Sequence, residues 1–416
     1  MRDKNFLNIH VLISHSPSCL NRDDMNMQKS AIFGGVRRVR ISSQSLKRAM
    51  RKSAYYAEHL GVPSDRTRDL ARLKNKYSQA LKGQFSPEMV AKTIALVVGK
   101  PEEVEADEAE KEDSKKDKKV AVAPWSVPEI ARLCQVIQDA ETQGLTALTA
   151  KETQDCEKKA KKAVDKAKKS GNTLTFEEAL QTEQLPLISK KLPKIVTKES
   201  QNLLAALRQT VDIALSGRMA TSGLMTSIDG ALALAHTITT HAADADIDWF
   251  TAVDDLVSEG SGHLDTQEFS AGVFYRYASL NIGQLQTNLG NASRQEALKI
   301  GKHLVHLLAT VVPTAKQNSF AAHNLADFVL VSFGDMPISA ANAFEEPIKP
   351  KKGLLKPSIT AFQTYWKHMQ DGYSLNDQVA LFSLLKDEKN EQGKKLITLF
   401  PCYNTLAELQ TWVTTD

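Results

Sequence analysis

The sequence predicts an α+β fold, and three observations lead to that class. Short segments with the two-residue alternation of β-strands occur near the N-terminus and again after residue 268 of the 416-residue chain. Longer segments with helical spacing lie between and after them. A charged stretch with helical character interrupts the middle of the chain. Strands that interleave with helices around one large insert indicate α+β, with 42% hydrophobic residues to form a core.

The first strand is predicted over residues 7–13, where Leu7, Ile9, Val11 and Ile13 alternate with other residues. This period of two indicates a strand with one buried face. Pro17 and the small polar residues around it predict the end of the strand. After a Gly-Gly turn, residues 36–42 alternate again and predict a second strand.

A basic helix is predicted from the serines at 42, 43 and 45 to about Leu60. Leu46, Ala49 and Met50 have helical spacing and form its apolar side. Lys47 with Arg51, and Arg48 with Lys52, are four residues apart and lie one turn apart on the surface.

The middle of the chain, residues 60–205, is predicted to be a helical insertion with charged segments near 101–120 and 150–195. Residues 102–119 hold nine acidic residues and five lysines, which predicts a disordered insert. An apolar helix is expected from Trp125 to about Ala140. Residues 157–169 are rich in Lys and Ala and predict a solvated helix or a second flexible insert.

Regular patterning returns at 202–217 and continues to the end of the chain. Residues 268–282 and 326–333 predict strands, and residues 293–313, 358–373 and 404–415 predict helices. Pro313 predicts the end of the first of these helices.

Charge is unevenly distributed although the net charge is only +4. No acidic residue occurs in the 33 positions between Asp24 and Glu58, and from Asp244 to Glu268 there is no Lys or Arg. The acid-free window holds eight cations: Lys29, Arg37, Arg38, Arg40, Lys47, Arg48, Arg51 and Lys52. Such opposite windows predict either a polyanion site or self-association.

Two further segments are ambiguous when judged from their residues alone. The small residues around Arg218 in 215–223 form either a plain turn or a loop that lets the backbone approach a nucleic acid. Trp249 and Phe250, in the acidic window, are either a core anchor or a wedge that stacks on a base.

Several classes of protein are excluded. No apolar run is long enough for a transmembrane helix, and the N-terminus is a poor secretory signal. The four cysteines form no CxxC pair, so a reduced, cytoplasmic protein is expected.

Catalytic, cofactor and metal sites are not predicted. His10, His15, His236 and His241 lack the spacing of a metal motif. Residues 244–255 place acids as in a calcium loop, but Trp249 takes the position that needs glycine.

Five segments together are specific to one family. Residues 7–29, 31–53 (AIFGGVRRVRISSQSLKRAMRKS), 211–223 (VDIALSGRMATSG), 246–256 and 266–278 closely resemble the CasC-type backbone subunit of the type I-E CRISPR surveillance complex, Cascade. The resemblance implies a modified RRM-like (ferredoxin-like) palm over 1–59, 206–242 and 274–416. It also implies a helical finger insertion over 60–205 and a thumb hairpin over 243–273.

The resemblance implies a non-catalytic function with named partners. Copies of such a subunit polymerise along the spacer of the guide RNA (crRNA), together with other Cascade subunits, in antiviral defence. Each thumb kinks the guide, and the segments between kinks pair with complementary target DNA. No cofactor and no membrane is implied. The RNA contacts implied for this chain are Arg22, Lys29, Ser42, Gln44, Ser45, Lys47, Arg51, Arg218, Met219, Thr221, Trp249, Phe250, Thr251 and Lys316.

Two alternative functions stay open at the level of sequence. One is a metal-dependent endonuclease that cuts target RNA, with Asp23 or Asp24 as the suspected carboxylate. The other is a general single-strand-binding protein without preference for a guide.

Overall fold

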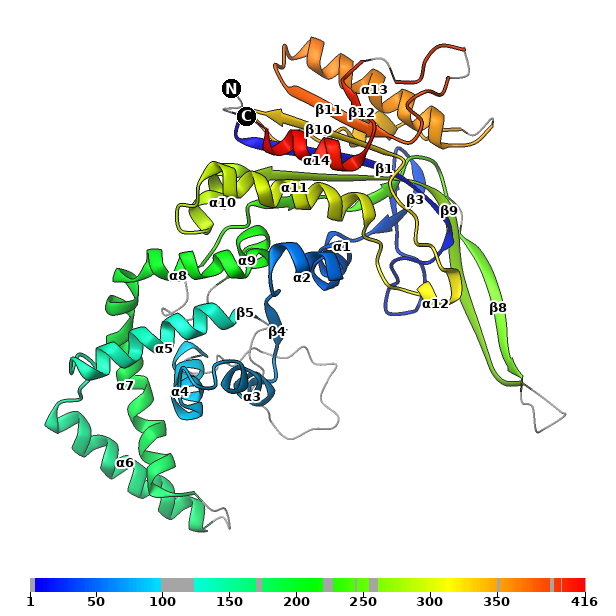
Figure 1. The fold of residues 1–416 in the computed structure, drawn as a ribbon. Coiled ribbons are helices and arrows are strands. Elements are labelled where there is room, and N and C mark those ends of the chain that lie inside the picture. The colour runs from blue at the N-terminus through cyan, green and yellow to red at the C-terminus, as the bar shows by residue number, and fades with distance from the viewer. Residues whose placement is uncertain are drawn as a thin grey trace. The chain divides into compact units, whose positions relative to one another are not determined.

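The computed structural model describes residues 4–98, 123–169, 174–219, 227–243, 245–253, 261–349, 352–389, 393–397 and 399–415. The predicted disordered insert near 101–120 lies outside these residues. The chain divides into two compact units (Figure 1). Unit 1 comprises Met1–Gly61, Ala231–Gln286 and Ser293–Asp416, and unit 2 comprises Val62–Gly230 and Thr287–Ala292. Both strands and helices are present, so the predicted α+β class is confirmed.

Unit 1 is built on one large, mostly antiparallel sheet. Its central strand β1 (Phe6–Ser18) lies between β9 (Ser261–Asn281) and β10 (Phe328–Gly334), with Ile9 opposite both Ala278 and Val331. The strand order is β12-β11-β10-β1-β9-β7-β3-β2, and β6 and β8 also pair with β9. The remaining strands are β2 (Ser30–Phe33), β3 (Val36–Ile41), β6 (Leu232–Leu234), β7 (Thr237–Thr239), β8 (Asp246–Val253), β11 (Gln378–Ser383) and β12 (Cys402–Tyr403).

Helices cover both faces of this sheet. Figure 1 shows α13 (Leu355–Gly372) on one side of the central strands, and α11 (Arg294–Thr310) and α14 (Leu406–Thr414) on the other. The approach of α11 is close, because a Cβ added to Gly301 would lie 2.8 Å from Cδ2 of Leu7. Unit 1 also contains the helices α1 (Ser43–Lys52) and α2 (Ala54–Leu60), and three shorter elements: α10 (Ile282–Asn288), α12 (Gln317–Phe320) and η3 (Ala341–Phe344).

Strand β1 differs from its prediction in two ways. It was expected to bury one face, but Asn8 and His10 on the second face are fully buried as well, because α13 covers that side. The strand also continues past Pro17 to Ser18, and its pairing with β9 shifts register between His15 and Ser18. A bulge of this kind accommodates a proline that cannot donate to the ladder.

His10 lies inside an aromatic cluster of this core. Its ring centroid is 5.1 Å from that of Tyr277 and 4.8 Å from that of Trp366, and its Nδ1 is 2.8 Å from the hydroxyl of Tyr275. Burial lowers the pKa of His10 to about 3, so the ring is neutral at neutral pH. His10 is therefore a core residue.

The helix expected over 42–60 is in fact two helices, α1 (Ser43–Lys52) and α2 (Ala54–Leu60). Ser53 separates them. Its hydroxyl donates to the carbonyl of Met50 at 2.7 Å and accepts from the backbone N–H of Tyr56 at 3.2 Å. One serine thus ends the first helix and caps the second.

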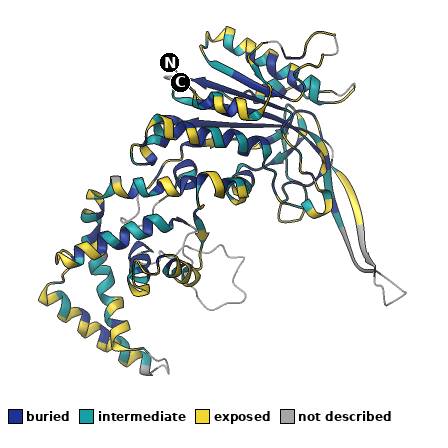
Figure 2. Ribbon diagram, in the orientation of Figure 1, coloured by how far each residue is buried: buried dark blue, intermediate teal, exposed yellow. Residues whose placement is uncertain are grey.

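Unit 2 is predominantly helical. Its core contains Tyr77, Ile94, Leu133, Ile137 and Leu192. The Lys/Ala-rich segment 157–169 is helical, as one of its two predicted forms, and Figure 2 shows its helix largely exposed or half-buried. The elements are β4 (Asp65–Thr67), α3 (Leu70–Ala80), α4 (Pro87–Val98), β5 (Ala123–Trp125), α5 (Val127–Thr142), α6 (Ala150–Lys169), α7 (Phe176–Lys198), α8 (Ser200–Ala206), η2 (Leu207–Gln209) and α9 (Val211–Ser216). Among the described residues, no helix is long and apolar enough to cross a membrane.

Candidate nucleic-acid interface

The eight cations of the acid-free window do not share one role. Arg38 is fully buried, and its guanidinium donates to the carbonyls of Phe33 at 3.1 Å, Thr239 at 3.3 Å and Phe344 at 2.8 Å. It therefore holds β3 against the rest of unit 1 and does not add to a surface field.

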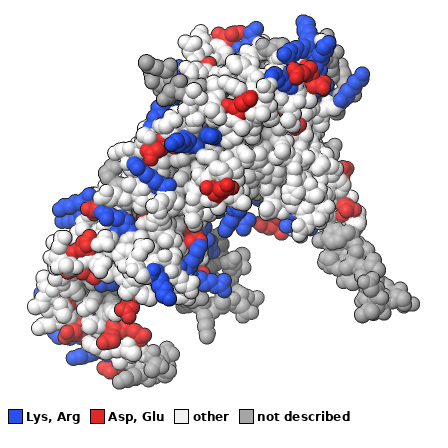
Figure 3. Space-filling model, in the orientation of Figure 1, with Lys and Arg blue, Asp and Glu red and all other residues white. Residues whose placement is uncertain are grey.

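The other seven cations of the window are half-buried or exposed. Figure 3 shows basic and acidic side chains interspersed over much of the face drawn, in keeping with the small net charge.

Helix α1 begins with the predicted serine cap. The hydroxyl of Ser42 accepts from the backbone N–H of Ser45 at 3.3 Å, and the Ser42 N–H donates to Oδ1 of Asn21 at 2.8 Å. Both hydrogen bonds of Ser42 therefore stabilise the fold. Gln44 is exposed and Ser45 is half-buried. The first turn of α1 holds no acidic residue, which favours an anion near this helix end.

The side chains of Lys47 and Arg51 follow one turn apart on α1, and both are half-buried. The Lys47 ammonium donates to the carbonyl of Leu232 at 3.3 Å, which fixes its position beside β6. Arg48 and Lys52 are exposed on a different side of the same helix. The helix thus presents two pairs of cations with different surroundings.

Arg22 and Lys29 flank a compact loop, residues 21–29. The Asp23 carboxylate closes this loop, because its Oδ1 accepts from the backbone N–H groups of Met25 and Met27, both at 2.9 Å. Asn26 has the left-handed φ of 65° that the turn requires, and its Oδ1 accepts from Arg22 at 2.6 Å. The loop is therefore preorganised, and Asp23 has a structural task within it.

Arg40 and His236 join Lys29 at the surface, and the sequence did not identify either as a site residue. The Arg40 N–H donates to the carbonyl of Lys29 at 2.9 Å, and Nη1 of Arg40 is 2.8 Å from Nδ1 of His236. Desolvation, followed by the charges of Arg40 and Lys29, lowers the pKa of His236. Arg40 stood in the acid-free window, but nothing in the pattern separated it from the buried Arg38.

Lys316 lies near the same loop. Arg22 and Lys316 are both close enough to Cys19 to oppose electrostatically the burial that raises the pKa of its thiol. Lys316 has a left-handed φ of 53° and caps the short helix α12. Phe320 at the end of α12 is 5.6 Å from Phe269 of β9, centroid to centroid. Arg22 and Lys316, nearly 300 residues apart in sequence, therefore both act on the surroundings of Cys19.

Strand β8 pairs with the first half of β9, and Figure 1 shows this ribbon running beyond the rest of the sheet. On β8, Ile247 lies opposite Glu268 and Trp249 opposite Thr266, so these four side chains share one face. Trp249 is 67% exposed and Ile247 is 56% exposed. Trp249 is thus a surface aromatic and not a core anchor.

Glu268 connects this ribbon face to the basic loop. Its Oε2 accepts from the backbone N–H of Gln28 at 2.8 Å, and the Gln28 amide donates to Ser270 at 2.7 Å. The exposed Trp249 and the loop that holds Arg22 and Lys29 are therefore attached to the same side of β9.

The other residues of the acidic window lie on the same ribbon or outside the described residues. Phe250 and Thr251 follow Trp249 on β8, opposite Asp265 and Leu264. Asp246 and Asp248 alternate with Ile247 and are exposed on the opposite face of the ribbon. Asp244, Asp254 and Asp255 lie outside the described residues, as does Thr221.

Arg218 is placed differently from the expectation that it lines a loop beside RNA. Its guanidinium is buried within unit 2 and makes a two-pronged ion pair with Glu129, with N–O distances of 2.5 and 2.7 Å. The next residue, Met219, is 85% exposed. The two neighbours therefore have opposite surroundings.

The four histidines considered as metal ligands are not assembled. His10 is in the core, Nε2 of His15 faces Arg276 at 3.3 Å, and Nδ1 of His241 donates to the carbonyl of Ala242 at 2.8 Å. Throughout the described ranges, no three His, Cys, Asp or Glu residues are grouped to hold a metal ion.

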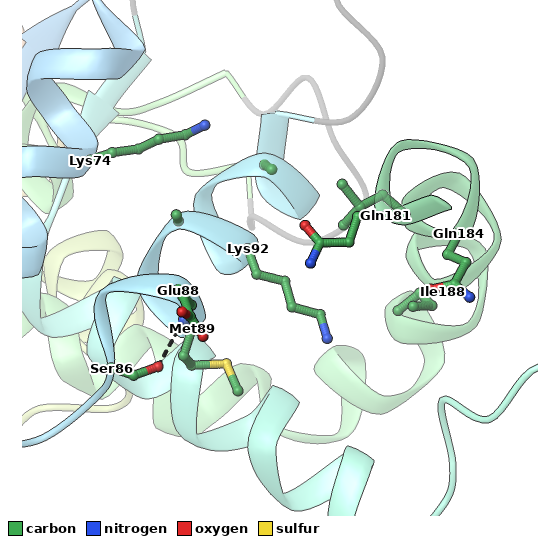
Figure 4. A pocket seen from close by; sticks show the side chains of 11 residues that line it. Lys74, Ser86, Glu88, Met89, Lys92, Gln181, Gln184 and Ile188 are labelled. Atoms are coloured by element: carbon green, nitrogen blue, oxygen red, sulfur yellow. Dashed lines mark hydrogen bonds between the residues drawn. The ribbon is translucent and has the colours of Figure 1, made fainter. Parts of the chain in front are cut away.

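A concavity of about 540 Å³ lies in unit 2 between α4 and α7 (Figure 4). It is lined by Lys92 and Gln181 among others, and by none of the predicted RNA-binding residues. The Lys92 ammonium is 2.5 Å from Oε1 of Glu141, and the hydroxyl of Ser86 accepts from the Met89 N–H at 3.2 Å. The Lys92 ammonium is thus already paired.

The described features define a class of protein: a sheet-based unit that presents cations beside an exposed aromatic on a two-stranded ribbon, combined with a helical unit. Comparison with known proteins then gives the family. The chain matches the family model Cas_CT1975, described as CT1975-like protein, over residues 7–412, and it belongs to this family.

Solved structures agree with this assignment. A chain titled "CRISPR RNA-guided surveillance complex, pre-nicking" is 26% identical, with a TM-score of 0.68, and the match covers 98% of this chain and 99% of that one. A second, titled "CRISPR RNA-guided surveillance complex", is 20% identical with a TM-score of 0.52, covers 98% of both chains, and shows likeness of fold. No curated protein sequence matches the chain. The resemblance to a Cascade-type backbone subunit, predicted from the sequence, is confirmed.

Proposed function

We propose that this protein is a non-catalytic backbone subunit that binds the guide RNA of a CRISPR surveillance complex in the cytoplasm. Copies of it polymerise along the crRNA spacer and, with other subunits, present guide segments for pairing with target DNA. The titles of the similar structures support the guide as ligand, since they name RNA-guided surveillance complexes.

The observation that carries this proposal is the attachment of a basic loop and an exposed aromatic to one side of β9. Arg22 and Lys29 supply charge to neutralise phosphates, and Lys316 adds a third cation whose charge, like that of Arg22, acts on Cys19. Trp249 supplies an apolar plate, 67% exposed, on which a base can stack. Gln28 and Glu268 hold the two parts together at 2.8 Å. Proteins bind single-stranded RNA with cations along its phosphate backbone and aromatic side chains on which its bases stack.

In this account the units take the roles of a right hand. The sheet of unit 1 is the RRM-like palm, the helical unit 2 is the finger insertion, and the β8–β9 ribbon is the thumb that kinks the guide. The antiparallel core β11-β10-β1-β9, with helices packed on it, supports the comparison with an RRM. The acidic residues of the ribbon remain candidates for contact with the next copy.

Removal of the Trp249 indole tests whether the thumb kinks the guide. The Trp249→Ala variant is expected to bind guide RNA about tenfold more weakly, because stacking on one base contributes on the order of 1–3 kcal/mol. Trp249→Phe keeps an aromatic face and is expected to retain most of the affinity. Fluorescence of 2-aminopurine placed along the guide measures unstacking, and an unchanged signal in Trp249→Ala would contradict a wedge at this position.

The endonuclease alternative is weaker because of the loop geometry. Asp23 has its Oδ1 occupied by two backbone N–H groups, which leaves the exposed Asp24 as the suspect. RNA cleavage that requires Mg²⁺ and disappears in Asp24→Ala would establish that alternative. We expect no cleavage above the buffer control.

The general-binder alternative differs in selectivity. If the protein recognises an assembled guide, a random RNA of equal length should compete at least tenfold less well than crRNA with its repeat-derived ends, in the presence of the partner subunits. Equal competition by the two RNAs would favour the general binder.

A further inference from the structure

The loop that starts at Gly217 has a closed base. The backbone N–H of Arg218 donates to the carbonyl of Ile228, and the N–H of Ile228 donates to the carbonyl of Arg218, both at 2.8 Å. A Cβ on Gly217 would lie 2.8 Å from both the nitrogen of Gly230 and the carbonyl oxygen of Ile228, and its φ of +79° favours glycine. The two ends of the loop are therefore held at a fixed separation.

The Arg218 side chain adds a second attachment. Its Nη1 and Nη2 each donate to one carboxylate oxygen of Glu129, and the side-chain exposures are 0% and 3%. Glu129 lies in the first turn of α5, where the helix dipole favours a carboxylate. A planar two-pronged pair fixes orientation as well as distance. The loop base is thus oriented relative to α5 by a side chain that solvent does not reach.

The helical frame around this pair is itself tied together within unit 2. The hydroxyls of Ser126, at the start of α5, and Thr210, before α9, are 2.8 Å apart. Asp212 of α9 accepts from the backbone N–H and the hydroxyl of Ser64 at 2.9 and 2.5 Å. The helix that leads into Gly217 and the helix that supplies Glu129 therefore share a common support.

We propose that Arg218 is a positioning residue and not an RNA contact: with Glu129 it forms a buried strut that aims the neighbouring Met219 at the guide. This inference rests on the proposed function. A guanidinium with no exposed surface cannot reach a phosphate, whereas Met219 is 85% exposed directly beside it. A buried ion pair contributes little net stability compared with apolar residues of similar volume. The Arg218–Glu129 pair does, however, fix the orientation of the two side chains, which an apolar pair would not do.

A double-mutant cycle separates aiming from general support of the fold. Met219→Ala removes the aimed group, and Glu129→Gln weakens the strut with an almost isosteric side chain. We expect guide affinity to fall about fivefold in Met219→Ala and about threefold in Glu129→Gln. The double variant should match Met219→Ala, because a strut has no effect once the aimed group is absent. Multiplied losses of about fifteenfold, or no loss in either single variant, would overturn the inference.

A double replacement of the ion pair distinguishes a loss of guide affinity from a loss of stability. Arg218→Met with Glu129→Met removes both charges and keeps the buried volume, so we expect a melting temperature close to that of wild type. Its guide affinity should fall as in Glu129→Gln, and wild-type affinity would overturn the strut. Failure of the wild-type protein to bind guide would overturn the proposed function, and the inference with it. Multiplied losses in a protein that binds guide would overturn the inference alone.

Discussion

Replacement of both Lys47 and Arg51 by alanine is expected to lower guide-RNA affinity about 100-fold. The two cations lie one turn apart on α1, beside an N-terminus that has no acidic residue in its first turn. A hydrogen bond to a charged group contributes roughly 1.5–3 kcal/mol, or at least about tenfold in affinity for each contact. The loss should be measured by fluorescence anisotropy with labelled crRNA.

The matched control is Arg48→Ala with Lys52→Ala. It removes two positive charges from the same helix, but from side chains that are exposed on another side. We expect less than about a threefold loss. The salt dependence distinguishes the pairs further, since each lost phosphate contact reduces the slope of log affinity against log salt by about 0.7 for a single strand. Equal losses in both double variants would mean that only net charge matters, and would contradict a defined contact surface on α1.

Acid is expected to destabilise unit 1 strongly. Burial lowers the pKa of His10 to about 3, and burial followed by the charge of Arg276 lowers the pKa of His15 to about 3. The unfolded chain binds a proton at these rings near pH 6.5, while the folded chain does not. The stability contributed by the neutral rings is therefore complete above about pH 6.5 and is lost as the pH falls toward 3. Each ring costs roughly 1.4 kcal/mol per pH unit in that window.

The His10→Gln variant isolates one part of this effect. Its side-chain amide can donate to or accept from the hydroxyl of Tyr275, which is 2.8 Å from Nδ1 of His10. Urea unfolding should be followed by fluorescence between pH 7 and 4, because Trp366 lies 4.8 Å from the His10 ring. We expect the slope of unfolding free energy against pH to fall by roughly 1.4 kcal/mol per unit relative to wild type. Parallel curves for the two proteins would show that His10 is protonated in the folded state.

Local patterns predicted the elements that depend on local physics. Residues 293–313 have a helical period, and the structure begins α11 at Arg294, where Ser293 and Glu296 form a capping box, and ends it at Thr310. Residues 326–333 are apolar and form β10. The second buried face of β1 was not predictable, because Asn8 and His10 are polar and the cover of α13 comes from more than 340 residues away. The sequence analysis did not predict strand β11, because its residues show no alternation that sets them apart from the flanking residues.

The sequence indicated which residues belong to the candidate site, but not the long-range contacts that hold them in place. The acid-free window identified Lys47 and Arg51, yet the same criterion included Arg38, whose partners are backbone carbonyls distant in sequence. The hydrogen bond from Gln28 to Glu268 joins residues 240 positions apart, and no local pattern predicts it. The burial of Arg218 against Glu129 has the same origin, because an ion pair across 89 positions leaves no periodic signal.

The most direct measurement of the central claim is size-exclusion chromatography of the protein co-expressed with its guide and partner subunits, recorded at 260 and 280 nm. The account predicts a large species rich in RNA that holds several copies of this chain. A monomer free of nucleic acid, under conditions in which the partner subunits themselves assemble, would contradict it.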